Sequence, residues 1–213
     1  MRMLLLIFFT LLLSACSSSP PQQKTIIDWT NFLEWNNHQY IGNEFLFVTN
    51  PSYIGRAVGT TSFHVEKHVH DKSYQPKNGD AAFLPEGTAL HAVKNRSAKQ
   101  VLAVSTQRVY TTKNFSLPSL DKETITKIQI TKEGKTVFST TDLSTIQTIH
   151  SIIKEGVEEE SPIPSSAPLS YTIYFTLSSP LSLKYTLHNI DGMFYLEQKK
   201  SVRLPEEFLY YVE

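Results

Sequence analysis

Short segments of alternating apolar and polar residues, divided by turn-forming pairs, constrain the fold of this 213-residue chain more than any other feature. Glu133-Gly134 stands between two such segments near the middle of the chain, and Asp191-Gly192 stands between two more near its end. Alternation places every second side chain on the same face of a strand, and a glycine-containing pair between strands indicates a hairpin. We therefore expect antiparallel strands that bury one face and expose the other.

Residues 28–112 are expected to form a mostly β domain. Asn36-Asn37 and Asn50-Pro51 are typical of turns and chain breaks, and the polar residues 95–99 predict a hairpin loop. The strands expected between these breaks cover residues 38–41, 62–70, 89–93 and 101–109.

Residues 113–122 are polar and contain a proline, which is typical of a linker. Residues 123–213 are expected to fold as a small α+β domain with an antiparallel sheet and one main helix. That domain begins with the hairpin at Glu133-Gly134 and continues with three strands in a meander, which we place at residues 169–178, 181–190 and 192–198. A final short helix is expected over residues 204–212. The whole chain is thus predicted to be α+β.

One segment has the period of a helix. Apolar residues recur at three- and four-residue spacing from Leu143, with Thr141 or Asp142 as the N-cap and Gly156 at the end. This spacing predicts one apolar stripe packed on the sheet. The stripe consists of Leu143, Ile146, Ile149, Ile152 and Ile153.

The first fifteen residues predict export from the cytoplasm. Arg2 is followed by a ten-residue apolar run from Leu4 to Leu13. This run is shorter than the roughly 20 residues that a membrane-spanning helix needs, and it has the length of the apolar part of a signal peptide. The next small residues lead directly into Cys16, which is the single cysteine of the chain.

Leu13-Ser14-Ala15-Cys16 resembles the lipobox of bacterial lipoproteins at every position of that motif. The resemblance implies that residues 1–15 are a signal peptide, that the Cys16 thiol carries a diacylglycerol group, and that the new amino terminus accepts a further acyl chain. Residues 16–27 would then be a lipidated tether, and the folded part would face the extracytoplasmic side of the cell membrane. Two acyl chains give stable anchoring where one gives only marginal binding.

A second resemblance covers the folded part. The unit NGDAAFLPEGTALHAV, the order of strands and helix, and DGMFYLEQ near the end are similar to a domain of unknown function in small lipoproteins of Bacillus-type Gram-positive bacteria. The resemblance implies a location and a fold, and it brings no catalytic residues.

Charge and cysteine content exclude several functions. The chain has 20 basic and 20 acidic side chains, so it has no excess of positive charge to hold nucleic acid or a membrane surface. A single cysteine excludes an internal disulfide and a metal site built from several cysteines. The stability of the folded part must therefore come from packing.

Histidines suggest one candidate metal site. If residues 62–70 form a strand, alternation places His64, Glu66, His68 and His70 on one face, and His91 would be the natural further ligand from a neighbouring strand. Imidazole suits zinc or copper. The alternative is a solvated strand face whose valines pack inward.

No catalytic motif is present: the chain lacks a nucleophile elbow, a phosphate-binding glycine loop and a His-Glu-x-x-His pair. We therefore expect a non-catalytic binding or envelope-interaction module with a cell-wall or protein partner. A metal-binding lipoprotein and an envelope hydrolase are the alternatives. Most strand aromatics are expected in the core, and a few would line a groove for a glycan or a peptide. The aromatics in question are Tyr171, Tyr174, Phe175, Tyr185, Phe194 and Tyr195.

Overall fold

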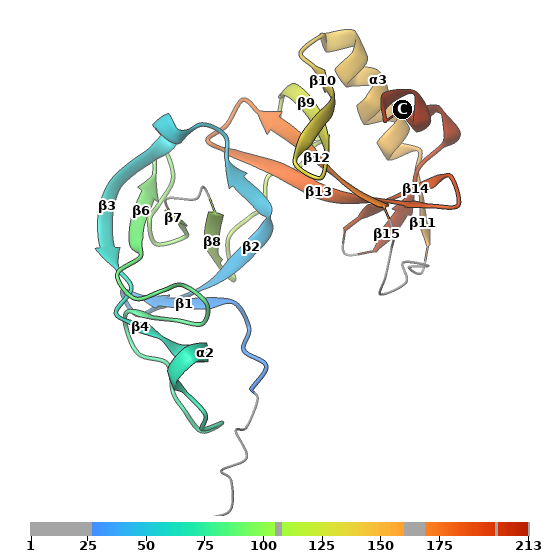
Figure 1. Cartoon of the computed structure of the whole chain (residues 1–213). Helices are drawn as coiled ribbons and strands as arrows, with labels where there is room; N and C mark the ends of the chain where they lie inside the picture. The colour runs from blue at the N-terminus through green and yellow to red at the C-terminus, as the bar shows by residue number, and fades with distance from the viewer. Residues whose placement is uncertain (1–26, 105–107, 160–168, 199, 213) are drawn as a thin grey trace, which may run out of the picture.

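The computed structural model describes residues 27–104, 108–159, 169–198 and 200–212. Across these residues the fold is mostly antiparallel β-sheet with few helices (Figure 1). One α-helix, α3 (Leu143–Lys154), is longer than a single turn among the described residues, as the α+β expectation requires. No described helix has the length and apolar character needed to cross a membrane.

The N-terminal strands form a curved sheet in the order β2-β8-β7-β6-β3, and β1 pairs with β2 at its start (Figure 1). Two short strands, β4 and β5, pair in parallel, and β5 also pairs with β1. The elements are β1 (Phe32–Trp35), β2 (His38–Val48), η1 (Pro51–Tyr53), β3 (Ile54–Thr60), β4 (Phe63–His64), α2 (Val65–His68), β5 (Asp80–Ala81), β6 (Ala89–Val93), β7 (Val101–Val104) and β8 (Arg108–Thr112).

The C-terminal strands form the order β10-β9-β12-β13, and β14, β15 and β11 follow beyond β13. Helix α3 packs on one face of this sheet (Figure 1). The strands are β9 (Ile125–Lys132), β10 (Lys135–Thr140), β11 (Val157–Glu159), β12 (Leu169–Leu177), β13 (Leu181–Ile190), β14 (Met193–Glu197) and β15 (Ser201–Arg203), and a 3-10 helix, η2 (Glu206–Tyr211), ends the described chain.

The local signals in the sequence are confirmed where they specify a turn or a cap. Asn36 and Asn37 both adopt positive φ (51° and 60°) between β1 and β2, as the tight hairpin turn that matches strand twist requires. Glu133-Gly134 and Asp191-Gly192 join β9 to β10 and β13 to β14 in the same way. Asp142, and not Thr141, caps α3: its side chain accepts a hydrogen bond from the Thr145 amide.

Two expectations about strands are wrong. Residues 65–68 form one helical turn instead of continuing a strand, and Val65 and Val69 are buried with Phe32 and Ala82. A strand would have placed both valines on one face as well, so alternation alone does not distinguish the two conformations. The strand expected over residues 101–109 is replaced by two strands, since residues 101–104 belong to β7 and residues 108–109 to β8, which pair antiparallel with each other.

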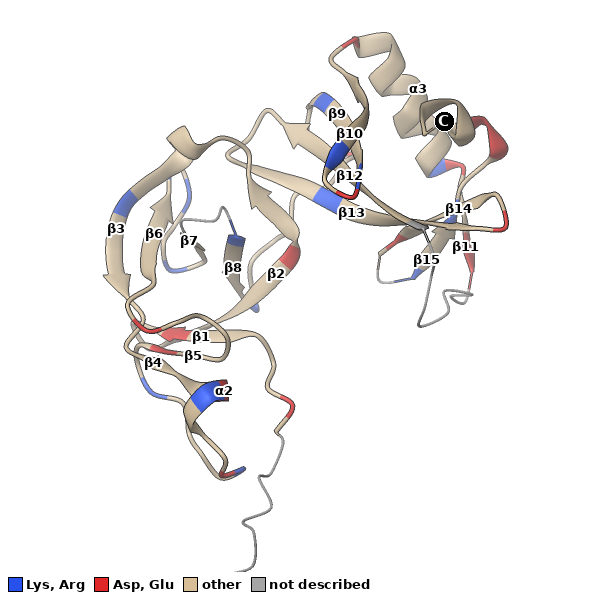
Figure 2. Cartoon of the chain, in the orientation of Figure 1, with Lys and Arg blue, Asp and Glu red and all other residues tan. Residues whose placement is uncertain are grey.

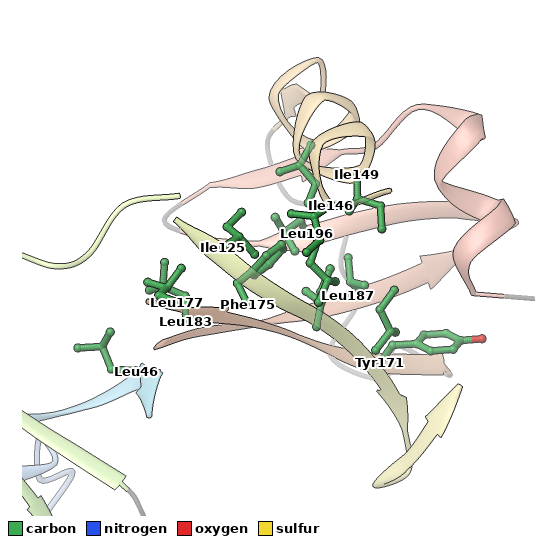
Figure 3. Close-up of a cluster of buried hydrophobic side chains, with 14 of the residues drawn as sticks. Leu46, Ile125, Ile146, Ile149, Tyr171, Phe175, Leu177, Leu183, Leu187 and Leu196 are labelled. Atoms are coloured by element: carbon green, nitrogen blue, oxygen red, sulfur yellow. The ribbon is translucent and has the colours of Figure 1, made fainter. Parts of the chain in front are cut away.

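The two sets of strands are joined into one sheet. Leu46–Val48 of β2 pair antiparallel with Leu181–Leu183 of β13. The strands that precede residues 113–122 and the strands that follow them are therefore hydrogen-bonded into one sheet. The main core also crosses the joint: it contains Leu46 and Val48 together with Phe175 and Leu183. In Figure 3 the side chain of Leu46 lies at one end of this cluster, and Ile146 and Ile149 of α3 lie above it. Packing is therefore shared between the two halves.

Candidate binding groove

A groove forms where β13 changes its partner strand. One edge of β13 pairs with β12. Its other edge pairs with β2 through Leu181–Leu183 and then with β14 through Thr186–Ile190. Lys184 and Tyr185 lie between these two ladders. On the opposite wall β2 carries a register shift between Asn43 and Phe47, which leaves Glu44 and Phe45 outside its ladder with β8. Bulges of this kind redirect side chains at functional sites. The resulting cavity has a volume of about 410 Å³.

Aromatic rings line the groove on both sides. Phe45 is 36% exposed, and its ring lies 5.8 Å from that of Tyr185. Tyr174 comes from β12, and its ring meets Phe47 edge to face at 5.6 Å. Tyr174 and Tyr185 are half-buried and both belong to the cavity lining. Tyr185 has the same parity on β13 as the core residues Leu183 and Leu187, and its ring also packs 6.1 Å from that of the buried Phe175. Burial raises the pKa of Tyr185 above its usual value, so this hydroxyl stays protonated and remains a donor at neutral pH.

Polar groups from the N-terminal strands form one wall. The Gly42 amide donates to the backbone oxygen of Asn31 at 2.8 Å, and the Tyr110 hydroxyl donates to Asn31 Oδ1 at 3.1 Å. A Cβ on Gly42 would lie 2.2 Å from Asn31 Nδ2, so the glycine is required for this close approach. Asn31 is thus held through both its backbone and its side chain, and it belongs to the groove lining.

Charged and hydroxyl groups complete the lining. Lys184, Thr172 and Thr186 alternate with core residues on β13 and β12, so they lie on the sheet face opposite α3. Glu197 from β14 also lines the groove, and its Oε2 lies 3.1 Å from Nε2 of the nearly buried His188. The groove therefore offers hydrogen-bond donors and acceptors beside aromatic residues.

The structure does not bring the predicted histidines together. His64 lies at the start of the helical turn, with Nε2 3.8 Å from Glu66 Oε2. His68 stacks on Phe63 at 5.4 Å between ring centroids, and His70 is exposed. His91 lies in β6, where its Nδ1 is 3.2 Å from the Gly55 carbonyl oxygen. Within the described ranges, no group of three or more histidine, cysteine, aspartate or glutamate side chains is arranged to hold a metal ion.

The strand on which the expected common face of His64, Glu66, His68 and His70 depended is wrong over residues 65–68, which form the helical turn α2. In a helical turn successive residues are rotated by about 100°, so the two-residue period no longer applies. Cys16, the predicted lipidation site, lies outside the described residues. Two carboxylates of β11 form ion pairs: Glu158 contacts Lys200 and Glu159 contacts Arg203.

Sequence reasoning found some of the groove. Tyr174 and Tyr185 belong to the strand aromatics that we expected to divide between core and groove, and alternation separates Tyr174 from the buried Ile173 and Phe175. No sequence pattern pointed to Asn31, Phe45 or Glu197 as groove residues. They reach the groove only because β13 pairs with β2 over one part of its length and with β14 over another. No protein-family model, curated protein or solved structure matches the chain.

Proposed function

We propose that this chain is a lipid-anchored, extracytoplasmic binding module without catalytic activity, and that it holds a segment of a polyhydroxylated glycan in the groove between β2, β12, β13 and β14. The observation that carries the proposal is the composition of the groove: the aromatic residues Phe45, Tyr174 and Tyr185 line it beside amide, hydroxyl and charged groups. The β-rich N-terminal half and the α+β C-terminal half of the chain each supply a wall of this groove.

The chemistry of a sugar ring suits this lining. A pyranose has an apolar face of C–H groups and an edge of hydroxyls that both donate and accept. Aromatic rings stabilise the apolar face by contact and burial, whereas the hydroxyls need partners because an unpaired polar group in a closed site is costly. Asn31 and Thr186 donate and accept, Lys184 donates, and Glu197 accepts. The volume of about 410 Å³ lies within the range of small-ligand sites.

The second part of the proposal is a lipid anchor on Cys16. Cys16 follows a short apolar run and two small residues, and this resemblance to a lipobox supports lipidation of its thiol. With the chain held at the outer surface of the cell membrane, the cell wall is the nearest polyhydroxylated polymer. The absence of a charge excess leaves the acyl chains as the means of attachment.

Groove binding is tested with Tyr174→Ala and Phe45→Ala in the purified lipoprotein. We expect each variant to weaken binding of soluble peptidoglycan-derived glycan fragments by about tenfold, because each removes a ring face worth about 1 kcal/mol or more. Isothermal titration measures the affinity. The bound glycan should be recovered intact, as a binding module leaves it.

Phe83→Ala is the matched control, because Phe83 is 42% exposed and does not belong to the groove lining. It should bind as the wild type does. Wild-type affinity in both groove variants, or no affinity for glycan fragments in the wild type, would exclude the groove as a glycan site. If the glycan is recovered cleaved, the protein is a hydrolase and not a binding module.

Anchoring is tested with Cys16→Ala, with Ser17→Ala as the neighbouring control. We expect Cys16→Ala to abolish labelling by radioactive palmitate and to leave the protein unprocessed or released from the membrane, because the thiol is the acceptor of the lipid. Ser17→Ala should be labelled and anchored normally. Undiminished lipid labelling of Cys16→Ala would disprove the proposed anchor.

A further inference from the structure

A second cavity lies at the open end of the N-terminal strands, and it shares no lining residue with the groove. Trp35, His38 and Tyr40 from the first hairpin form one side, and Arg56 of β3 and Lys99 from the loop between β6 and β7 form the other. Its volume is about 540 Å³. The mouths of curved and closed sheets are common places for ligand sites. We call this cavity the Trp35 cleft.

Close packing fixes the walls of the Trp35 cleft. A Cβ built on Gly59 of β3 would lie 2.1 Å from the Trp35 ring, so the glycine lets the first hairpin and β3 approach and holds the indole at the edge of the cleft. The Tyr40 hydroxyl donates to the Ala98 carbonyl oxygen at 2.7 Å. This bond ties the loop that carries Lys99 to β2. The aromatic and cationic groups are therefore set on ordered backbone.

The charge of the Trp35 cleft has one sign. Arg56 and Lys99 are basic and exposed, His38 lies beside them, and no Asp or Glu belongs to the lining. Figure 2 shows one basic segment on β3, which is Arg56, and one acidic segment on β1, which is Glu34. Glu34 alternates with Trp35 and bonds Gln39 at 2.7 Å, so its carboxylate lies on the other face of the hairpin. Neither Arg56 nor Lys99 forms an ion pair with a described residue.

We propose that the Trp35 cleft binds an anionic group, a phosphate or a carboxylate, carried on a small molecule whose ring packs against the Trp35 indole. The guanidinium of Arg56 offers paired donors that match the terminal oxygens of such a group, and the Lys99 ammonium adds a second cation from another element. The indole provides the apolar surface for the ring. This proposal is independent of glycan binding in the groove, because the two sites share no lining residue. A negative result at one site leaves the proposal for the other unaffected.

The test uses the full-length lipoprotein in detergent, labelled with fluorotryptophan. The chain has two tryptophans, Trp29 and Trp35, and Trp29 packs on Phe32 and Tyr74 away from the cleft. Phenyl phosphate and benzoate are titrated separately, to distinguish phosphate from carboxylate. At least one of them should shift the ¹⁹F resonance of Trp35 saturably and leave that of Trp29 unchanged. Inorganic phosphate and benzyl alcohol should each bind more weakly, because each has only half of the recognised chemistry.

Arg56→Gln and Lys99→Gln should each weaken the better anionic probe by about tenfold, the effect of losing one charge-assisted hydrogen bond. Lys135→Gln on β10 removes an exposed positive charge far from the cleft in sequence and should bind normally. The proposal is overturned if neither probe shifts the Trp35 resonance, if Arg56→Gln binds like Lys135→Gln, or if benzyl alcohol binds as well as the anions.

Discussion

Asp142 shows how one side chain sets the start of α3. Its carboxylate accepts hydrogen bonds from the Ser144 hydroxyl and from the backbone amide and hydroxyl of Thr145. The Ser144 hydroxyl makes the largest contribution, and together with the Thr145 bonds it lowers the Asp142 pKa to about 2. The first amides of a helix have no partner within the helix, so this carboxylate satisfies a need that Leu143 and its neighbours cannot.

The low pKa predicts how stability depends on pH. In the unfolded chain an aspartate titrates near pH 3.9, so the contribution of Asp142 is fully present above about pH 4 and is lost as the pH falls toward 2. Between pH 4 and about pH 2, the midpoint temperature of thermal unfolding, measured by circular dichroism, should fall more in the wild type than in Asp142→Asn. Asparagine also caps helices but has no charge to lose. Equal pH dependence of the two proteins would contradict this account.

At the scale of elements, α3 separates what periodicity predicts from what the surroundings decide. The predicted stripe is confirmed at Ile146, Ile149, Ile152 and Ile153, which are buried. Leu143 shares the spacing and lies in the first turn of the helix, but it is 60% exposed. Periodicity identifies the apolar face, and the tertiary structure decides how much of that face is covered.

This difference gives a matched pair of variants. Ile149→Ala removes a fully buried side chain and should lower the free energy of unfolding by about 2–5 kcal/mol, through lost burial and the cavity left behind. Leu143→Ala should change it by less than about 0.5 kcal/mol. Urea unfolding monitored by circular dichroism measures both. Similar destabilisation by the two substitutions would show that the stripe is buried along its whole length.

The turn at residues 65–68 shows the opposite case. Val65 and Val69 lie four residues apart, a spacing that fits one face of a helix and also one face of a strand. The structure forms a helical turn, in which the Val69 amide donates to the Val65 carbonyl oxygen at 2.8 Å, and both valines pack in a cluster with Phe32 and Ala82. A local pattern compatible with two periods is decided by tertiary packing. The predicted histidine face depended on that decision.

At the scale of the whole molecule, the joint between β2 and β13 is held by a buried polar group. Ser182 is fully buried, and its Oγ accepts from the Leu177 amide at 2.9 Å. The Thr49 hydroxyl donates to the Ser179 carbonyl oxygen, so in the 2.6 Å contact between the Thr49 and Ser182 hydroxyls the serine is the donor. One side chain thus links the end of β2 to the turn between β12 and β13.

Ser182→Ala should therefore destabilise both halves together. It leaves the Leu177 amide without its partner, which we expect to lower the free energy of unfolding by about 1–3 kcal/mol. Tryptophan fluorescence reports on the N-terminal half, which contains Trp29 and Trp35, and amide hydrogen exchange in α3 reports on the other. Both measurements should show the same decrease in the free energy of unfolding, because the sheet and the core are continuous across the joint between β2 and β13.

Ser170→Ala on β12 is the control, since Ser170 is exposed, and it should change stability by less than about 0.5 kcal/mol. Two separate unfolding transitions in the wild type would contradict cooperative unfolding. A loss confined to one half of the Ser182→Ala protein would also contradict it.

Local sequence was enough to specify the hairpin turns at Asn36-Asn37, Glu133-Gly134 and Asp191-Gly192, the extent of α3, and the apolar alternation of β12. These features follow from backbone preferences and burial within a few residues. The pairing of β2 with β13, between residues more than one hundred positions apart, is visible only in the folded molecule. With that pairing comes the groove that gathers Asn31, Phe45, Tyr174 and Glu197. No local propensity specifies which two strands meet, because their pairing depends on how much apolar surface the complete sheet buries.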